Sequence, residues 1–303
     1  GRTFSQQTFA TSYYLKKPNL LISVAKGLVG GQAHRQIARS ESCAASTVTR
    51  LAARLGRHGI LLQALLVSFI GVIEEVIVYD HFETFGISQY FPFGAGTAVG
   101  QETRFIYFLD AAPHRRTGSM SPVQKKRRAE LEERHGRPPR DSYARAAAET
   151  LGFLMSKVPP DSSLHLVSDD HRQYPRAIVR HPERRRIEHA VYPNPKRGPK
   201  GSARSADAIT RDTQMATVDH AHQLIRHSCS HHRRETLAYA RRHSALLERL
   251  FLHVVWVNLA KLWIENDPHS GTRAMRAGLT DERWDWERIL ARRLQPHEVD
   301  LSA

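Results

Sequence analysis

One extended run constrains the fold of this chain more than any other segment. Residues 72–83 read VIEEVIVYDHFE, and β-branched residues dominate them. Such residues favour strands because a branched side chain packs well on a pleated surface. Two further strand candidates follow at 96–102 and 104–110, each bounded by Gly, Pro or charged residues. The simplest arrangement of the three is an antiparallel meander.

Helices and short strands alternate after this meander. The sequence predicts a charged helix over 121–135 and a second helix over 141–157. Residues 164–170 read LHLVSDD, which is typical of a short buried strand that ends in acid, and 186–192 form another strand candidate. Three strands, a helical connection, two strands and further helices predict an α/β (α+β) fold with an RNase-H-like mixed sheet and flanking helices.

The last third of the chain is predicted to be helical after a basic loop at 194–211. Helical periodicity returns from 213 to about 263 in two pieces, and the tail from 267 onward is expected to be a small helical cap. The second piece is expected to fill the core with apolar residues, namely Leu237, Leu246, Leu247, Leu250, Phe251, Val254, Val255 and Trp256.

The first 70 residues predict a small helical domain. Helices are expected at 19–29, at 32–40, from an N-cap at Ser46 through Gly56, and at 61–70. The second and third helices, joined by a turn at 41–45, have the order of a helix-turn-helix. The side chains expected to reach bases and phosphates of DNA are Arg35, Thr47, Thr49, Arg50, Arg54 and Arg57. A three-helix unit that only packs against its neighbours is the alternative.

The charge balance favours a polyanionic partner. The 303 residues contain 45 Lys and Arg against 30 Asp and Glu, a formal charge of +15 that recurs along the whole chain. Nucleic acid is the first candidate, and a basic protein without such a partner, or one on an anionic membrane surface, is the alternative. No apolar stretch reaches the roughly 18 residues needed to span a bilayer. Two distant cysteines suggest no disulfide framework, which fits the cytoplasm.

Cutting or joining a phosphodiester requires carboxylates that hold divalent cations. Asp80 lies in an otherwise apolar strand, and Asp169 follows the strand at 164–168, so both are predicted metal ligands. The third acid is expected from a late helix, and the candidates are Glu235 at the start of the apolar helix and Asp219. Glu235 is preferred as catalytic and metal-binding residue. For each acid alone, a capped turn, a first-turn helix acid or a surface salt bridge is the plain alternative.

Other chemistries have weaker support in the sequence. The histidine-rich stretch at 220–232 pairs with no cysteine set that is typical of structural zinc, since Cys229 is isolated there. Phosphate contact or surface placement is the expected role of these histidines. The sequence contains neither a Gly-x-Ser-x-Gly turn nor a phosphate-binding loop ending in Gly-Lys-Ser/Thr, so neither a serine hydrolase nor a nucleotide hydrolase is indicated.

The order of several blocks resembles bacterial insertion-sequence transposases with an RNase-H-like DDE core. Residues 36–38 with 46–51 are similar to the helix-turn-helix of that family. VYDHFE at 78–83 and VSDDHRQY at 167–174 resemble its first two catalytic blocks. LIRH at 224–227 with RETLAY at 234–239 resembles its late helical block. GRTFS at 1–5 looks like the end of a zinc ribbon that is truncated upstream, so the chain is expected to be a fragment.

The resemblance implies an enzyme that recognises the terminal inverted repeats of a transposon. Asp80 and Asp169 would be the first two catalytic acids, and either Glu235 or Asp219 would be the third. Two Mg²⁺ or Mn²⁺ ions would serve strand cleavage, and the freed 3′-hydroxyl would attack target DNA. The partners would be double-stranded DNA and further copies of the chain on that DNA. The expected place is the bacterial cytoplasm, associated with the nucleoid.

Three domains are expected: a DNA-binding helix-turn-helix domain at 1–70, a catalytic core at 71–265 with a helical insertion near 121–158, and a helical tail at 266–303. Two other functions stay open. A non-catalytic regulator or domesticated transposase would keep the helix-turn-helix and tolerate loss of the acids. A cellular RNase-H-like nuclease would cut a DNA or RNA structure, and a helix-turn-helix that reads sequence argues against it.

Overall fold

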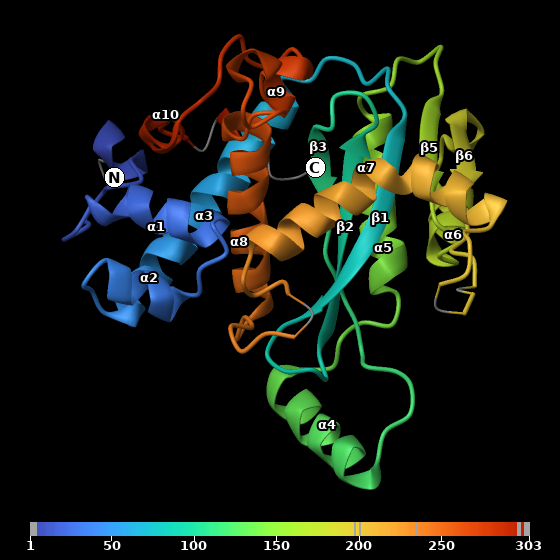
Figure 1. The fold of residues 1–303 in the computed structure, drawn as a ribbon, viewed down its shortest axis with the longest axis horizontal. Coiled ribbons are helices and arrows are strands. Elements are labelled where there is room, and N and C mark those ends of the chain that lie inside the picture. The colour runs from blue at the N-terminus through green and yellow to red at the C-terminus, as the bar shows by residue number, and fades with distance from the viewer. Residues whose placement is uncertain (1–4, 197, 200, 234, 296–297, 300–303) are drawn as a thin grey trace. The chain divides into compact units, whose positions relative to one another are not determined.

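The computed structural model describes residues 5–196, 198–199, 201–233, 235–295 and 298–299. The start of the chain, parts of the expected basic loop and Arg234 of the late block lie outside the described residues. The chain forms two compact units (Figure 1). The terminal unit comprises Gly1–Gly71 and Leu224–Ala303, and the sheet unit comprises Val72–Gln223. Residues 224–265, which we expected in the catalytic core, belong to the terminal unit.

A mixed sheet forms the centre of the sheet unit. Its strands are β1 (Ile77–Phe85), β2 (Pro92–Gly100), β3 (Ile106–Leu109), β4 (Ala112–Pro113), β5 (Leu164–Ser168) and β6 (Ile187–Val191). The order is β3-β2-β1-β5-β6, and β4 pairs with β2. The pairs β1–β2 and β2–β3 are antiparallel, whereas β1–β5 and β5–β6 are parallel. The predicted α/β class with a mixed sheet is confirmed.

Helices accompany both faces of this sheet. They are α4 (Pro122–His135), α5 (Ser142–Met155), α6 (Gln173–Arg180), the first part of α7 (Ala206–Ser228) and the 3₁₀ turn η2 (Arg184–Arg186). Successive side chains of a strand point to opposite faces. Asp110 at the end of β3 bonds to Tyr79 of β1 and to Thr150 of α5, so α5 covers one face. The rings of Phe82 in β1 and His222 in α7 lie 5.1 Å apart, so α7 covers the other.

Helices also build the terminal unit. They are η1 (Gln6–Phe9), α1 (Leu20–Val29), α2 (His34–Ser40), α3 (Ala45–Ser68), α8 (His243–Val255), the π-helical turn η3 (Trp256–Ala260), η4 (Pro268–Ser270), α9 (Arg273–Arg276) and α10 (Trp286–Ala291). The turn between α2 and α3 spans four residues and includes Ser42 in the left-handed region at φ 47°. Among the described residues, no helix is both long and apolar enough to cross a membrane.

Several predicted elements differ from the observed ones. The helices predicted at 46–56 and 61–70 are one continuous helix, α3, because Gly56 and Gly59 pack against α8 and do not end the helix. Its N-cap is Ala44, where Ser46 was expected. Helix α6 was not predicted, and the expected loop at 194–211 already enters α7 at Ala206.

The apolar helix begins later than the sequence predicts. Helix α8 starts at His243, and the preceding stretch is not helical. Leu237, which we expected in the core, is fully exposed because it lies in this stretch. Glu235, expected at the start of the helix, is also exposed and non-helical. The helical prediction for this segment was therefore wrong.

The contact between α3 and α8 gives a first prediction. A Cβ added at Gly56 would meet the backbone carbonyl of Glu248, so Gly56→Ala should lower the free energy of unfolding by about 1–3 kcal/mol. Gly152→Ala in α5 is the matched control, because its Cβ would meet nothing within 4 Å. The control should stabilise the protein by up to about 1 kcal/mol through helix propensity. Urea unfolding measures both, and a Gly56→Ala variant as stable as Gly152→Ala would contradict this packing.

Candidate active site

Two predicted acids lie close to each other on neighbouring parallel strands: Asp80 is within β1, and Asp169 directly follows β5. Strands β1 and β5 are in register at Tyr79 and Ser168, and Asp80 and Asp169 each come one residue later. Carboxyl ends of parallel strands meet at one edge of a sheet, which is where ligands bind in open α/β sheets. The pairing therefore brings together two acids that are far apart in the sequence.

The electrostatics of Asp80 show that a third acid is close. Burial and, after it, the negative charge of Asp169 raise the pKa of the Asp80 carboxyl to about 7. Asp219 of α7 also acts in this direction, whereas His81 opposes the shift. Three carboxylates therefore share one partly desolvated region of the sheet unit, and their mutual repulsion would be relieved by a cation.

Asp219 and Asp169 each have neutralising or orienting partners. Arg211, two turns earlier in α7, forms an ion pair with Asp219. The amide of His171 donates to Asp169 Oδ1 at 3.0 Å, and Asn194 Nδ2 donates to Oδ2 at 3.3 Å. Asp170, the next residue along the chain, is exposed. The two acids are thus held in place by groups that come from three different segments.

Tyr174 of α6 connects Asp80 to a buried ion pair. Its hydroxyl lies 3.3 Å from Asp80 Oδ1 and 2.9 Å from His81 Nδ1. On the other side of the imidazole, His81 Nε2 lies 2.8 Å from Asp110 Oδ1. The chain of contacts runs from Asp110 through His81 and Tyr174 to Asp80. It orients the Tyr174 hydroxyl so that it donates to the Asp80 carboxylate.

The pKa shifts of His81 and Asp110 both favour a charged pair inside the sheet unit. Burial lowers the pKa of His81, but Asp110 and the neighbouring acids outweigh it, so the net shift is upward. Burial raises the pKa of Asp110, but the His81 charge and hydrogen bonds from Tyr79 and Thr150 outweigh it, so the net shift is downward. The amide of Gly96 also donates to Asp110 at 3.0 Å. Asp110 is thus a buried carboxylate with several partners, as a buried charge requires.

The three carboxylates are suitable ligands for a divalent cation, but their side chains do not point to one common position in this structure. Asp80, Asp169 and Asp219 offer the carboxylate oxygens that Mg²⁺ and Mn²⁺ prefer. His222 of α7 adds an imidazole nitrogen 3.9 Å from Asp80 Oδ2. Within the described part of the chain, no three His, Cys, Asp or Glu side chains surround a common point. A shared ion would require Asp219 to leave Arg211 and turn towards the other two acids.

Glu235, which the sequence analysis preferred as the third acid, lies in a different environment from Asp219. It lies in the terminal unit on an exposed, non-helical segment. Of the two candidates for the third acid, Asp219 is the one whose charge acts on Asp80. The expectation that Glu235 begins a core helix is the part that the structure overturns, and its role in chemistry stays a prediction.

The predicted DNA-contacting side chains divide into two groups. Arg54 donates to the carbonyl oxygens of Thr11 and Tyr13 at 3.0 and 2.6 Å, so it anchors the N-terminal segment. Arg57 pairs with Glu248 at 3.4 Å, although 60% of its side chain is exposed. The others, which are exposed or half-buried on α2 and α3, are Arg35, Thr47, Thr49 and Arg50.

The histidine-rich stretch does not behave as the sequence suggests. His231 and His232 are buried, and burial lowers their pKa values, that of His232 to about 3. Both are therefore neutral at pH 7, whereas we expected phosphate contact or surface placement. His220 and His227 are exposed. The buried pair lies 4.5 Å apart by ring centroids and packs inside the terminal unit.

Sequence reasoning missed three residues of this site: His81, Asp110 and Tyr174. Alternation along the strand at 77–85 places His81 opposite Asp80, but nothing in the sequence shows that an acid faces it. Asp110 lies at the end of the strand predicted at 104–110. An acid at the end of a predicted strand is the pattern that singled out Asp169, so the same pattern could have identified Asp110. Tyr174 lies in helix α6, which was not predicted, so the direction of its side chain could not be inferred from the sequence.

Comparisons with known proteins give no identification. No family model matches the chain, and no curated protein matches its sequence at a significant level. The resemblance to insertion-sequence transposases therefore rests on the blocks of the sequence itself.

Proposed function

We propose that this protein is a DNA transposase, which binds the terminal inverted repeats of a transposon and uses Mg²⁺ or Mn²⁺ to cleave and transfer DNA strands. The observation that carries the proposal is the electrostatic coupling of Asp80 with Asp169 and Asp219 at one region of a mixed sheet. Such sets of carboxylates neutralise charge on phosphodiester oxygens through bound cations. The net charge of +15 supports a DNA substrate.

The site residues have separate roles in this proposal. Asp80 and Asp169 would hold the cation, which supplies the Lewis acidity that the chemistry needs. Tyr174 would keep Asp80 oriented, because its hydroxyl is itself fixed by His81. Asp219 is preferred as the third acid over Glu235, since its charge reaches Asp80. The protein would act as a homo-oligomer on DNA in the bacterial cytoplasm, associated with the nucleoid.

The second candidate is a non-catalytic helix-turn-helix protein. It is favoured by the ion pair between Arg211 and Asp219, which occupies a carboxylate that an active enzyme would need. An assay separates the two functions. The full chain is incubated with supercoiled plasmid and with duplexes that end in candidate inverted repeats, in Mn²⁺, in Mg²⁺ and in EDTA. Metal-dependent nicks or joined products support the transposase, and DNA binding without either product supports the regulator.

The third acid can be assigned with the same assay. Asp219→Asn should reduce metal-dependent cleavage at least about 100-fold, because removing one catalytic group commonly costs this much or more. Glu235→Gln, the matched change of an exposed acid, should leave the rate within about twofold. The reverse pattern would assign Glu235. Equal and small effects of both changes would remove the third-acid role from each.

A further inference from the structure

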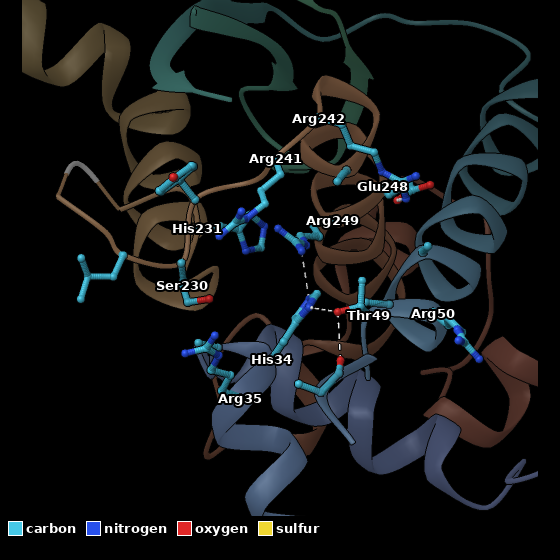
Figure 2. Close-up of a pocket in the computed structure, with 18 of the residues that line it drawn as sticks. His34, Arg35, Thr49, Arg50, Ser230, His231, Arg241, Arg242, Glu248 and Arg249 are labelled. Atoms are coloured by element: carbon cyan, nitrogen blue, oxygen red, sulfur yellow. Dashed lines mark hydrogen bonds and ion pairs between the residues drawn. The ribbon is translucent and has the colours of Figure 1, made fainter. Parts of the chain in front are cut away.

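A cavity of about 930 Å³ lies inside the terminal unit (Figure 2). Helices α2 and α3 form one side of it, and residues 230–231, 237–239, 241–242, 245 and 248–249 form the other. The arginines that line it are Arg35, Arg50, Arg57, Arg241, Arg242 and Arg249. Helix α3, which carries most of the side chains predicted to contact DNA, is therefore one wall of this cavity.

The lining has a large excess of positive charge. Glu248 is the only acid of the lining, and both Arg57 and Arg242 already pair with it, at 3.4 and 3.3 Å. Arg35 and Arg241 are exposed, and neither forms an ion pair with a residue that the structure describes. Like charges held at one cavity repel each other, so an anion that enters it is stabilised.

Arg249 is the most organised cation of the cavity. Its guanidinium donates to His34 Nε2 at 3.0 Å, and His34 Nδ1 lies 3.0 Å from Thr49 Oγ1 (Figure 2). Burial lowers the pKa of His34 to about 4, so this imidazole is neutral and accepts from Arg249 through Nε2. The Thr49 hydroxyl in turn donates to the carbonyl of Ala45 at 3.0 Å. A neutral network thus fixes a partly buried guanidinium on which the charge of Glu248 acts, but which forms no ion pair with a described residue of the lining.

The rest of the lining includes several small or apolar residues. Ala52, Ala53 and Ala245 leave room in the hollow, and the ring of Tyr239 and the fully exposed side chain of Leu237 lie at its lining. Unpaired bases stack on aromatic and apolar side chains, while arginines hold the phosphates that link them. The chemistry of the walls therefore matches a nucleotide with its phosphate better than a phosphate alone.

We infer that this cavity binds single-stranded DNA, with phosphates on Arg35, Arg241 and Arg249 and an unpaired base against Tyr239 and Leu237. The inference rests on the proposed function, which makes DNA the ligand. It adds that the terminal unit binds this DNA in single-stranded form. A convex helix fits the major groove of a duplex. A concave hollow with cations on its walls fits a strand whose bases are unpaired. Opened transposon ends would supply such a strand.

Binding of fluorescent oligothymidylate and of a matched duplex, measured by anisotropy in EDTA, tests the inference without any catalysis. Arg35→Ala/Arg241→Ala should weaken oligothymidylate binding at least about 10-fold. It should also lower the slope of log affinity against log salt by about 0.7 for each lost phosphate contact. Lys16→Ala/Lys26→Ala is the control, because it removes two exposed charges of the same unit outside this cavity. It should change the affinity about twofold or less.

A variant without a charge change separates DNA binding inside the cavity from nonspecific electrostatic attraction of DNA to the protein. Ala238→Trp fills the lining without changing charge, and it should weaken oligothymidylate binding about 10-fold while duplex binding changes little. Equal losses for Arg35→Ala/Arg241→Ala and the lysine control, or unchanged binding by Ala238→Trp, would overturn the inference. A variant that loses only duplex binding would also overturn it. Cleavage by the wild type in Mn²⁺ tests the proposed function separately, so the two failures are distinguishable.

Discussion

Asp80→Asn is expected to abolish metal-dependent DNA cleavage, with a loss on the order of 10⁴-fold. Removing one member of a catalytic set that acts as a unit has effects of this size. Affinity for DNA in EDTA should stay the same or rise, because the change removes a negative charge near the phosphates. The measurement compares nicking rates in Mn²⁺ with anisotropy in EDTA for the same protein preparations.

The same substitution should stabilise the folded protein. The pKa of Asp80 is raised to about 7 from 3.8, so the native state keeps the proton to higher pH than the unfolded chain does. The stability that Asp80 contributes is therefore lost as pH rises between about 4 and 7. Three pKa units correspond to at most about 4 kcal/mol, and Asp80→Asn should recover part of this above pH 7. Below pH 4 the two proteins should be equally stable without metal.

Asp170→Asn is the control for both effects. It removes an exposed acid next to Asp169, and it should change neither the cleavage rate nor the pH dependence of unfolding by a measurable amount. A stable Asp80→Asn protein that still cleaves DNA in Mn²⁺ would remove Asp80 from the chemistry. A cleavage-dead variant that is less stable than wild type at pH 8 would show that the carboxylate is structural.

Asp110→Asn is expected to be the most destabilising single change in the sheet unit. Asp110 accepts from Tyr79, Thr150 and Gly96 and pairs with His81 in a buried environment. Breaking a buried pair by neutralising one partner costs about 3–5 kcal/mol, because the other charge is left without compensation. Thr150→Val removes one hydrogen bond to the same carboxylate and should cost only about 1–3 kcal/mol.

The pH dependence identifies this loss as electrostatic. The lowered pKa of Asp110 stabilises the native state above about pH 4, and this stability is lost as pH falls through its folded pKa. The raised pKa of His81 stabilises the native state below about pH 6.5, and this is lost as pH rises through its folded pKa. The deficit of Asp110→Asn should therefore be largest between these limits. A deficit that is equal from pH 3 to pH 9 would show that only packing is lost.

The positions of the tryptophans allow two optical signals to distinguish the units. All four lie in the terminal unit, namely Trp256, Trp263, Trp284 and Trp286, and the sheet unit contains none. Circular dichroism reports both units, whereas tryptophan fluorescence reports the terminal unit. Asp110→Asn should move the circular dichroism transition in urea. If it moved the fluorescence transition alone, Asp110 would have no role in the sheet unit.

Local patterns were sufficient to predict most elements of the sheet. Alternating and β-branched residues at 72–83 and 164–170 predicted strands close to β1 and β5, because side-chain period and propensity are properties of a short segment. The helical period likewise predicted α4 and α5 within a few residues. The helical prediction for the stretch before His243 was wrong. Leu237 has an apolar side chain, but its segment does not pack into the core. The sequence alone does not show which apolar residues find packing partners.

The sequence by itself determined the kinds of elements, the charge of the chain and the candidate acids Asp80 and Asp169. Only the tertiary structure decided which groups meet: parallel pairing of β1 with β5 unites the two acids, and α7 adds Asp219. The same holds for the buried pair of His81 with Asp110 and for the cavity lined by Arg249. The physical reason is that periodicity is set by neighbours within a few residues, whereas burial and pKa depend on residues brought together from distant parts of the chain.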